Sequence, residues 1–219
     1  MHSGIFALDT RDLRDIASDC LDETGRLRVM PASYYASIKP EERAWFALRH
    51  GFYCLPTVEL ADWLRRFISA RSAIEIGAGN GVLAQYLGIP ATDSYMQDDP
   101  SIRLYYKVHG QPTIPYGPNV ERIEALDAAK KYEPGIILGS WITHRWDPQD
   151  PSRGGNMYGP DLPAILRHCS QYVLIGNELT HGANPLWARK HEVVYPPWLY
   201  SRSLNHGREF IAIWNGDKP

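Results

Sequence analysis

Residues 73–93, "AIEIGAGNGVLAQYLGIPATD", constrain the fold more than any other part of the chain. The apolar segment 73–76 predicts a strand, and the glycines at 77, 79 and 81 predict a tight turn. "VLAQYLG" predicts a short helix that ends at Gly88, and "IPATD" predicts a second strand that ends at Asp93. A strand, a glycine turn, a helix and a second strand in this order are typical of a parallel sheet with a ligand site at the turn.

Four further short apolar segments have the character of strands: "VERIEAL" (120–126), "GIILGSWI" (135–142), "YVLIGNE" (172–178) and "REFIAIWN" (208–215). Helical or loop stretches separate them, and the last strand is compatible with an antiparallel place. We therefore expect an α/β, Rossmann-like doubly wound fold, with a mostly parallel sheet and helices on both faces. Residues 97–118 do not show a regular helical pattern, so a long loop or insert is expected there. The role of this insert and that of the loop 147–161 stay open.

The N-terminal region shows helical patterns. Leu13, Ile16 and Cys20 have helical spacing behind Thr10, and "PEERAWFALRHG" places Pro40 in a first helical turn. In "TVELADWLRRFI", Thr57 is a predicted cap before an apolar stripe. We divide the chain into a helical extension (1–54) that packs on the core and an α/β domain (55–219).

Composition excludes several functional classes. The net charge of −2 gives no global signal for nucleic-acid binding, and no apolar run is long enough to cross a membrane. The first residues lack a signal-peptide pattern, and three dispersed cysteines suit a reducing compartment. A cytoplasmic location is therefore expected.

The glycine turn matches a dinucleotide fingerprint poorly. Starting from Gly77, the third small residue of G-x-G-x-x-G/A is replaced by Val82. Starting from Gly79, the pattern passes through Gly81 and Ala84, but Asp93 then follows only 14 positions later. Ribose-binding acids of dinucleotide sites lie about 20 residues on. An NAD-binding enzyme is thus the weaker interpretation.

"EIGAGNG" closely resembles motif I of class I S-adenosylmethionine-dependent methyltransferases, and the resemblance covers about residues 55–214. It implies S-adenosyl-L-methionine as cofactor, with Glu75 in the acidic position and Asp93 on the ribose hydroxyls. A carboxylate beside the turn suits this ligand, which carries an ammonium and a sulfonium group but no phosphate. The full expected cofactor-binding set is Glu75, Gly77, Ala78, Gly79, Asn80, Gly81, Asp93, Ser94, Leu126, Asp127, Ala128, Ser140 and Trp141.

The resemblance also implies that an adenine-contacting segment ends the third strand. Leu126, Asp127 and Ala128 fit that segment, with Asp127 accepting the adenine amino hydrogen. An equally weighted alternative is that Asp127 is only an acid in the first turn of a helix. Ser140 to His144, at the end of the fourth strand, would face the transferred methyl group.

Candidate catalytic side chains follow the fourth and fifth strands: His144, Tyr158, Glu178 and His181. His144 is the best base by residue type, and Tyr158 lies in a long Pro/Gly-rich loop typical of substrate binding. Both histidines have the alternative of a purely structural role. Because no tight histidine spacing links them to Glu178, no metal site is expected.

We therefore expect a methyltransferase whose acceptor (small molecule, protein or nucleic acid) the sequence does not identify. A non-catalytic S-adenosylmethionine-binding or interaction protein of the same fold is the alternative. Near the C-terminus, Trp198, Tyr200, Arg202 and Arg208 either contact a planar, nucleotide-like ligand or are core aromatics with surface arginines.

Overall fold

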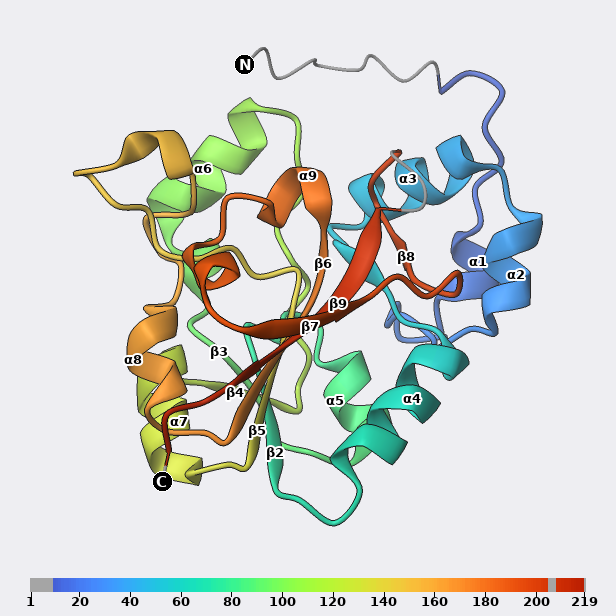
Figure 1. The fold of residues 1–219 in the computed structure, drawn as a ribbon. Helices are drawn as coiled ribbons and strands as arrows, with labels where there is room; N and C mark the ends of the chain where they lie inside the picture. The colour runs from blue at the N-terminus through green and yellow to red at the C-terminus, as the bar shows by residue number, and fades with distance from the viewer. Residues whose placement is uncertain (1–9, 205–207, 219) are drawn as a thin grey trace.

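The computed structural model describes residues 10–204 and 208–218, which form a seven-stranded sheet with helices on both faces (Figure 1). The expectation that the first residues carry no signal peptide concerns 1–9, which lie outside the described residues. The sheet contains β2 (Ala73–Ile76), β3 (Ala91–Asp93), β4 (Val120–Arg122), β5 (Ile136–Ser140), β6 (Gln171–Asn177), β7 (His191–Val194) and β9 (Glu209–Asn215). All strands that we predicted are present.

The strand order is β4-β3-β2-β5-β6-β9-β7. β9 pairs antiparallel with both β6 and β7, whereas the pairs from β4 to β6 are parallel. The order reverses between β2 and β5, and open α/β sheets bind ligands beyond the carboxyl ends of strands at such a point. The Rossmann-like doubly wound fold is confirmed, and the antiparallel β9 distinguishes it from an all-parallel dinucleotide sheet.

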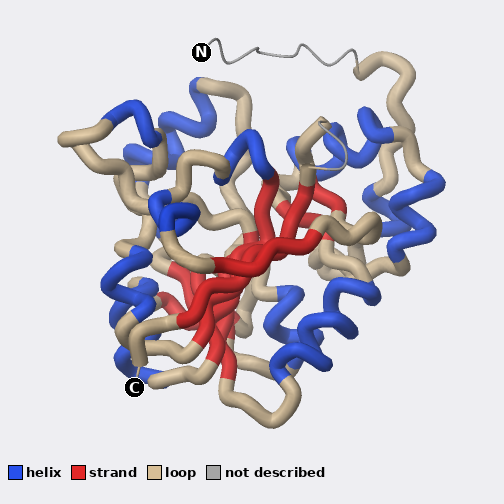
Figure 2. The backbone as a smooth tube through the Cα atoms, viewed as in Figure 1, coloured by secondary structure: helices blue, strands red, loops and turns tan. Residues whose placement is uncertain are grey.

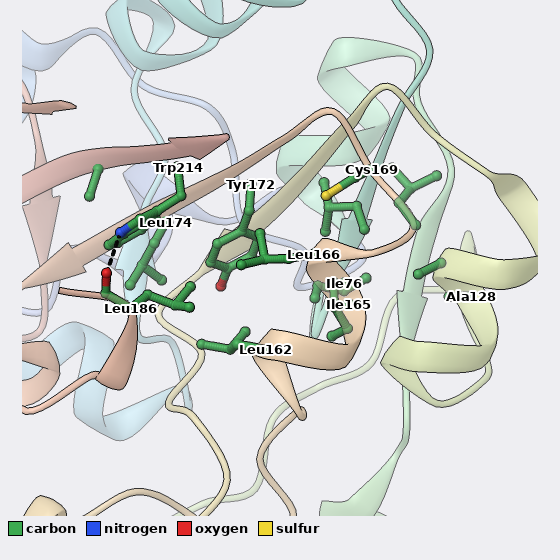
Figure 3. Close-up of a cluster of buried hydrophobic side chains, with 14 of the residues drawn as sticks. Ile76, Ala128, Leu162, Ile165, Leu166, Cys169, Tyr172, Leu174, Leu186 and Trp214 are labelled. Carbon is green, nitrogen blue, oxygen red and sulfur yellow. Dashed lines mark hydrogen bonds between the residues drawn. The ribbon is translucent and has the colours of Figure 1, made fainter. Parts of the chain in front are cut away.

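Two hydrophobic clusters cover the two faces of the sheet, as the tube view also indicates (Figure 2). On one face, α4 (Val58–Ile68) and α5 (Val82–Leu87) pack through Leu60, Leu64 and Leu83. On the other face lie α7 (Ala125–Tyr132), α8 (Leu162–Leu166) and η3 (Pro185–Ala188). There the Trp214 indole N–H donates to the Leu186 carbonyl at 2.7 Å (Figure 3).

Local signals positioned several helix ends correctly. The Thr57 hydroxyl accepts the Leu60 N–H at 3.1 Å at the start of α4, and Gly88 ends α5 in the left-handed region. α3 (Pro40–Arg49) begins at its proline. α1, however, spans only Ala17–Cys20, so the helix expected to start behind Thr10 begins later.

The N-terminal helices α1, α2 (Ala32–Ser37) and α3 share a hydrophobic cluster with Val82 of α5. A short strand, β1 (Cys54–Leu55), pairs antiparallel with β8 (Tyr200–Ser201). The N-terminal segment is thus fastened to the C-terminal part of the chain.

The expectation of an irregular insert at 97–118 was wrong for its first half. η1 (Met96–Asp98) leads into α6 (Pro100–Val108), where the Asp99 carboxylate accepts the Ser101 and Ile102 N–H groups. α6 has no buried residue, so it lacks the apolar stripe by which a helix is predicted. The other short helices are η2 (Pro151–Arg153) and α9 (Glu178–His181). Within the described ranges, no helix is long and apolar enough to span a membrane.

Candidate functional site

The glycine turn after β2 needs glycine for two reasons. Gly77, Gly79 and Gly81 have φ values of 58°, 54° and 67°, in the left-handed region that L-residues rarely adopt. A Cβ atom on Gly77 would also overlap the Ile142 side chain, and one on Gly81 would overlap Val120. The turn therefore brings bare backbone to the carboxyl edge of the sheet.

Glu75 lies in β2 and is only 2% exposed. Its Oε2 atom accepts the Ala84 N–H from α5 at 3.0 Å, and its side chain lines a cavity next to the glycine turn. Burial raises the pKa of Glu75 to about 8, an effect that the Ala84 bond lowers and nearby Asp93 reinforces. A buried carboxylate of this kind favours a cationic partner in the cavity.

Asp93 ends the neighbouring strand β3 and is 8% exposed. Its Oδ2 accepts the Gly79 N–H and its Oδ1 the Tyr95 N–H, both at 2.9 Å. Burial raises the pKa of Asp93, while these backbone bonds oppose the rise. The carboxylate thus connects β3 to the turn and still lines the cavity, where its remaining lone pairs are available for a ligand.

The cavity has a volume of about 560 Å³, within the roughly 300–1,000 Å³ typical of small-molecule sites. The glycine turn, the ends of β3 and β5 and several loops line it. Of the predicted cofactor set, the lining includes Glu75, Gly77, Ala78, Gly79, Asn80, Asp93, Ser94, Ser140 and Trp141. Gly81, Leu126, Asp127 and Ala128 do not line it.

The segment predicted to contact adenine is displaced along the chain. β4 ends at Arg122, so Leu126–Ala128 already belong to α7. Asp127 is 63% exposed and pairs with Lys130 at 3.8 Å, and Ala128 is fully buried. Glu124, at the N-cap of α7, and Ala125 line the cavity instead. A strand predicted to end at Arg122 would have pointed to Glu124.

The four candidate catalytic side chains are not brought together in the cavity. Tyr158 lines it, whereas His144 and His181 are buried outside its lining. Burial lowers the pKa of both histidines, to about 4 for His181, so both are neutral at pH 7. Glu178 forms an ion pair with Arg208 at 3.0 Å.

Trp141 directly follows β5 and has a φ of 59°, a strained value for a bulky side chain. Its N–H donates to the Ile175 carbonyl at 2.8 Å, which holds this conformation. The indole ring lies 5.5 Å from the His181 ring and 6.4 Å from the Tyr53 ring. Backbone strain thus places an aromatic ring in the cavity wall.

Several lining residues come from the insert, whose role sequence reasoning left open. Tyr106 and Tyr116 line the cavity, as does the buried Gln97, whose Oε1 accepts the Ile114 N–H at 2.8 Å. Tyr116 stacks on Tyr95 with ring centroids 4.0 Å apart. The tyrosine content of the insert is the one signal that pointed to this wall. In the described parts of the chain, no group of His, Cys, Asp and Glu is arranged to hold a metal ion.

No protein family model and no curated protein sequence matches this chain. Among solved structures, it is similar to a Pyrococcus abyssi tRNA (uracil-54, C5)-methyltransferase in complex with S-adenosyl-L-homocysteine. The identity is 11% and the TM-score 0.41, over 74% of this chain and 39% of that one.

A SAM-dependent methyltransferase from Agrobacterium tumefaciens matches at 13% identity and a TM-score of 0.35, over 72% of this chain and 61% of that one. A precorrin-6y C5,15-methyltransferase from Geobacter metallireducens matches at 16% identity and a TM-score of 0.39, over 73% and 89%. The chain thus spans less than two thirds of the first two proteins. Because all three TM-scores lie below 0.5, the fold is assigned from the strand order of this chain itself.

Proposed function

We propose that this protein is an S-adenosylmethionine-dependent methyltransferase. The observation that carries the proposal is Glu75: a carboxylate buried beside a glycine turn, lining the cavity, with one backbone hydrogen bond. An ammonium group would supply the positive charge that such a carboxylate favours.

The other residues of this wall fit the rest of the cofactor. Gly77 and Gly79 let a ligand approach the backbone, and Asp93 is placed to accept hydrogen bonds from two ribose hydroxyls. Glu124 and Ala125 would contact the adenine in place of Leu126–Ala128. When bound, the cofactor supplies an activated methyl group.

A dinucleotide fits this wall less well. The Glu75 carboxylate lies where a negatively charged pyrophosphate would approach the turn, and like charges in a buried site repel strongly. The antiparallel β9 also departs from the dinucleotide sheet.

On the acceptor side, the protein's task is positioning, because in-line transfer of an activated methyl group requires few catalytic side chains. Tyr158 lines the cavity and is the predicted catalytic residue best placed to contact an acceptor. We assign His144 and His181, both buried, the positioning of the loops that follow β5 and β6. Glu178, paired with Arg208, would act at the rim.

Calorimetric titration with S-adenosylmethionine, S-adenosylhomocysteine and NAD tests the proposal. We expect micromolar binding of both sulfur compounds and none of NAD. Glu75→Gln should weaken their binding at least about tenfold, since it removes a charge-assisted contact. Glu41→Gln, an exposed glutamate of α3, is the matched control. Binding of NAD alone, or equal affinities of all three proteins, would contradict the proposal.

Methyl transfer itself needs a separate measurement. Release of S-adenosylhomocysteine, measured with pools of small-molecule, peptide and RNA acceptors, should show one active class. Tight cofactor binding without turnover in any pool would instead favour the non-catalytic binding protein.

A further inference from the structure

Arg202 is the one lysine or arginine among the described residues that line the cavity. The other charged lining residues are the carboxylates Glu75, Asp93 and Glu124. The guanidinium of Arg202 lies over the Tyr53 ring, 3.8 Å from its centroid. A single cation in a wall otherwise charged by carboxylates calls for a reason.

The backbone explains how Arg202 reaches this place. β8 pairs with β1, and the ladder continues for one residue, because the Arg202 N–H donates to the Tyr53 carbonyl at 3.1 Å. Tyr53 is in turn held by its hydroxyl, 3.3 Å from the Tyr106 hydroxyl. Arg202 and its aromatic platform are therefore fixed to each other by two elements far apart in sequence.

The guanidinium nevertheless has no protein partner for its five N–H donors: no hydrogen bond or ion pair joins it to any described residue. Arg43, close by, is the contrast. It lies 4.9 Å from the Tyr200 ring centroid, but it is buried and donates to the carbonyls of Tyr35 and Ile38. Arg43 therefore has a structural role, whereas Arg202 presents a free planar fork to the cavity.

We propose that Arg202, stacked on Tyr53, is a carboxylate-binding subsite of the cavity. A guanidinium held flat on a ring is pre-organised for bidentate binding of a carboxylate. The carboxylate belongs either to the amino-acid part of the cofactor or to an acceptor. The aromatic residues Tyr53, Tyr106 and Trp141 in the same wall suit a planar acceptor. This inference rests on the proposed function only for the first of the two sources.

Calorimetry on the wild type, Arg202→Gln and Arg65→Gln tests the subsite. Arg65 is the matched control, because it also lies over a tyrosine, Tyr86, but is exposed and pairs with Asp62. The probes are S-adenosylhomocysteine, 5′-methylthioadenosine (which lacks the amino and carboxyl groups), benzoate and its neutral isostere benzamide. Benzoate and benzamide are titrated with and without S-adenosylhomocysteine.

We expect Arg202→Gln to lose at least about tenfold in affinity for one carboxylate probe and to bind both neutral probes like the wild type. A loss for S-adenosylhomocysteine identifies the cofactor as the source, and a loss for benzoate identifies the acceptor. Arg202→Lys should restore little, since it keeps the charge but not the fork. Thermal melting should not change, because the guanidinium has no protein partner to lose.

Unchanged affinity of Arg202→Gln for both carboxylate probes would overturn the subsite, as would no preference of the wild type for benzoate together with unchanged S-adenosylhomocysteine binding. The proposed function fails differently. If S-adenosylhomocysteine does not bind the wild type but benzoate binds in an Arg202-dependent way, the methyltransferase assignment falls and the subsite stands.

Discussion

The two halves of the sheet's carboxyl edge are built by different means. On the β2–β3 side, the cavity wall consists of backbone and two buried carboxylates, Glu75 and Asp93, which bond to neighbouring N–H groups. On the β5–β6 side, longer loops supply the wall, with Trp141 and Tyr158 as lining side chains. The first half is rigid and made for one ligand, whereas the second depends on loops that different acceptors can shape.

The largest expected effect breaks the β2–β3 side. Gly77→Ala should abolish S-adenosylhomocysteine binding and lower the free energy of unfolding by about 2–5 kcal/mol, because it adds a left-handed alanine and an overlap with Ile142. Gly88→Ala is the matched control: its φ is 71°, but a Cβ there meets nothing within 4 Å. Its cost should stay near 1–2 kcal/mol, with binding retained. Equal effects in calorimetry and urea unfolding would show that the turn is not tightly packed.

Glu75 provides the next effect, a pH dependence. Its pKa of about 8 exceeds the ordinary value of 4.5, so the folded protein keeps a proton that the unfolded chain has released across this window. The free energy of unfolding of the ligand-free protein should therefore fall as the pH rises from about 5 to about 8, by a few kcal/mol. In urea unfolding, Glu75→Gln should remove most of this slope. An identical slope in the variant would mean that Glu75 is not the titrating group.

Asp93→Asn should have a smaller effect. It weakens the charge-assisted bonds to Gly79 and Tyr95 and should cost about 1–3 kcal/mol in cofactor binding. Asp99→Asn offers a close comparison, since Asp99 also accepts two backbone N–H groups but is exposed and outside the cavity. The account expects binding to be unaffected in that variant; a similar loss in both would point to a general effect of the substitution.

The smallest effect distinguishes two acids of the same helix. Glu124→Gln should weaken S-adenosylhomocysteine binding by about 0.5–1.5 kcal/mol, because Glu124 lines the cavity. Asp127→Asn should change it by less than about 0.5 kcal/mol, because Asp127 is exposed and paired with Lys130. The opposite ranking in calorimetry would restore the adenine contact expected from the sequence.

The same contrast explains what could be predicted. The glycine turn, its flanking strands and the caps at Thr57 and Gly88 follow from short-range rules, because φ values and hydrogen bonds are local. α6 and β7 were missed because neither has a buried apolar pattern. Asp127 was placed three residues too late because a strand's end depends on its neighbour β3, which the sequence of β4 alone does not show.

Long-range pairing limited the prediction of the acceptor side. Arg202 reaches the cavity through the β1–β8 ladder, which joins residues about 150 positions apart. His144 and His181 were expected as candidate bases from residue type, but their burial depends on packing among loops. Residue type alone therefore identified good candidates there without their arrangement.

The most direct measurement is a crystal structure of the protein with S-adenosylhomocysteine. The account predicts the ligand in this cavity, with its ammonium within hydrogen-bond distance of a Glu75 oxygen and both ribose hydroxyls on Asp93. A ligand bound elsewhere, or one with its ribose away from Asp93 and its ammonium away from Glu75, would contradict the account.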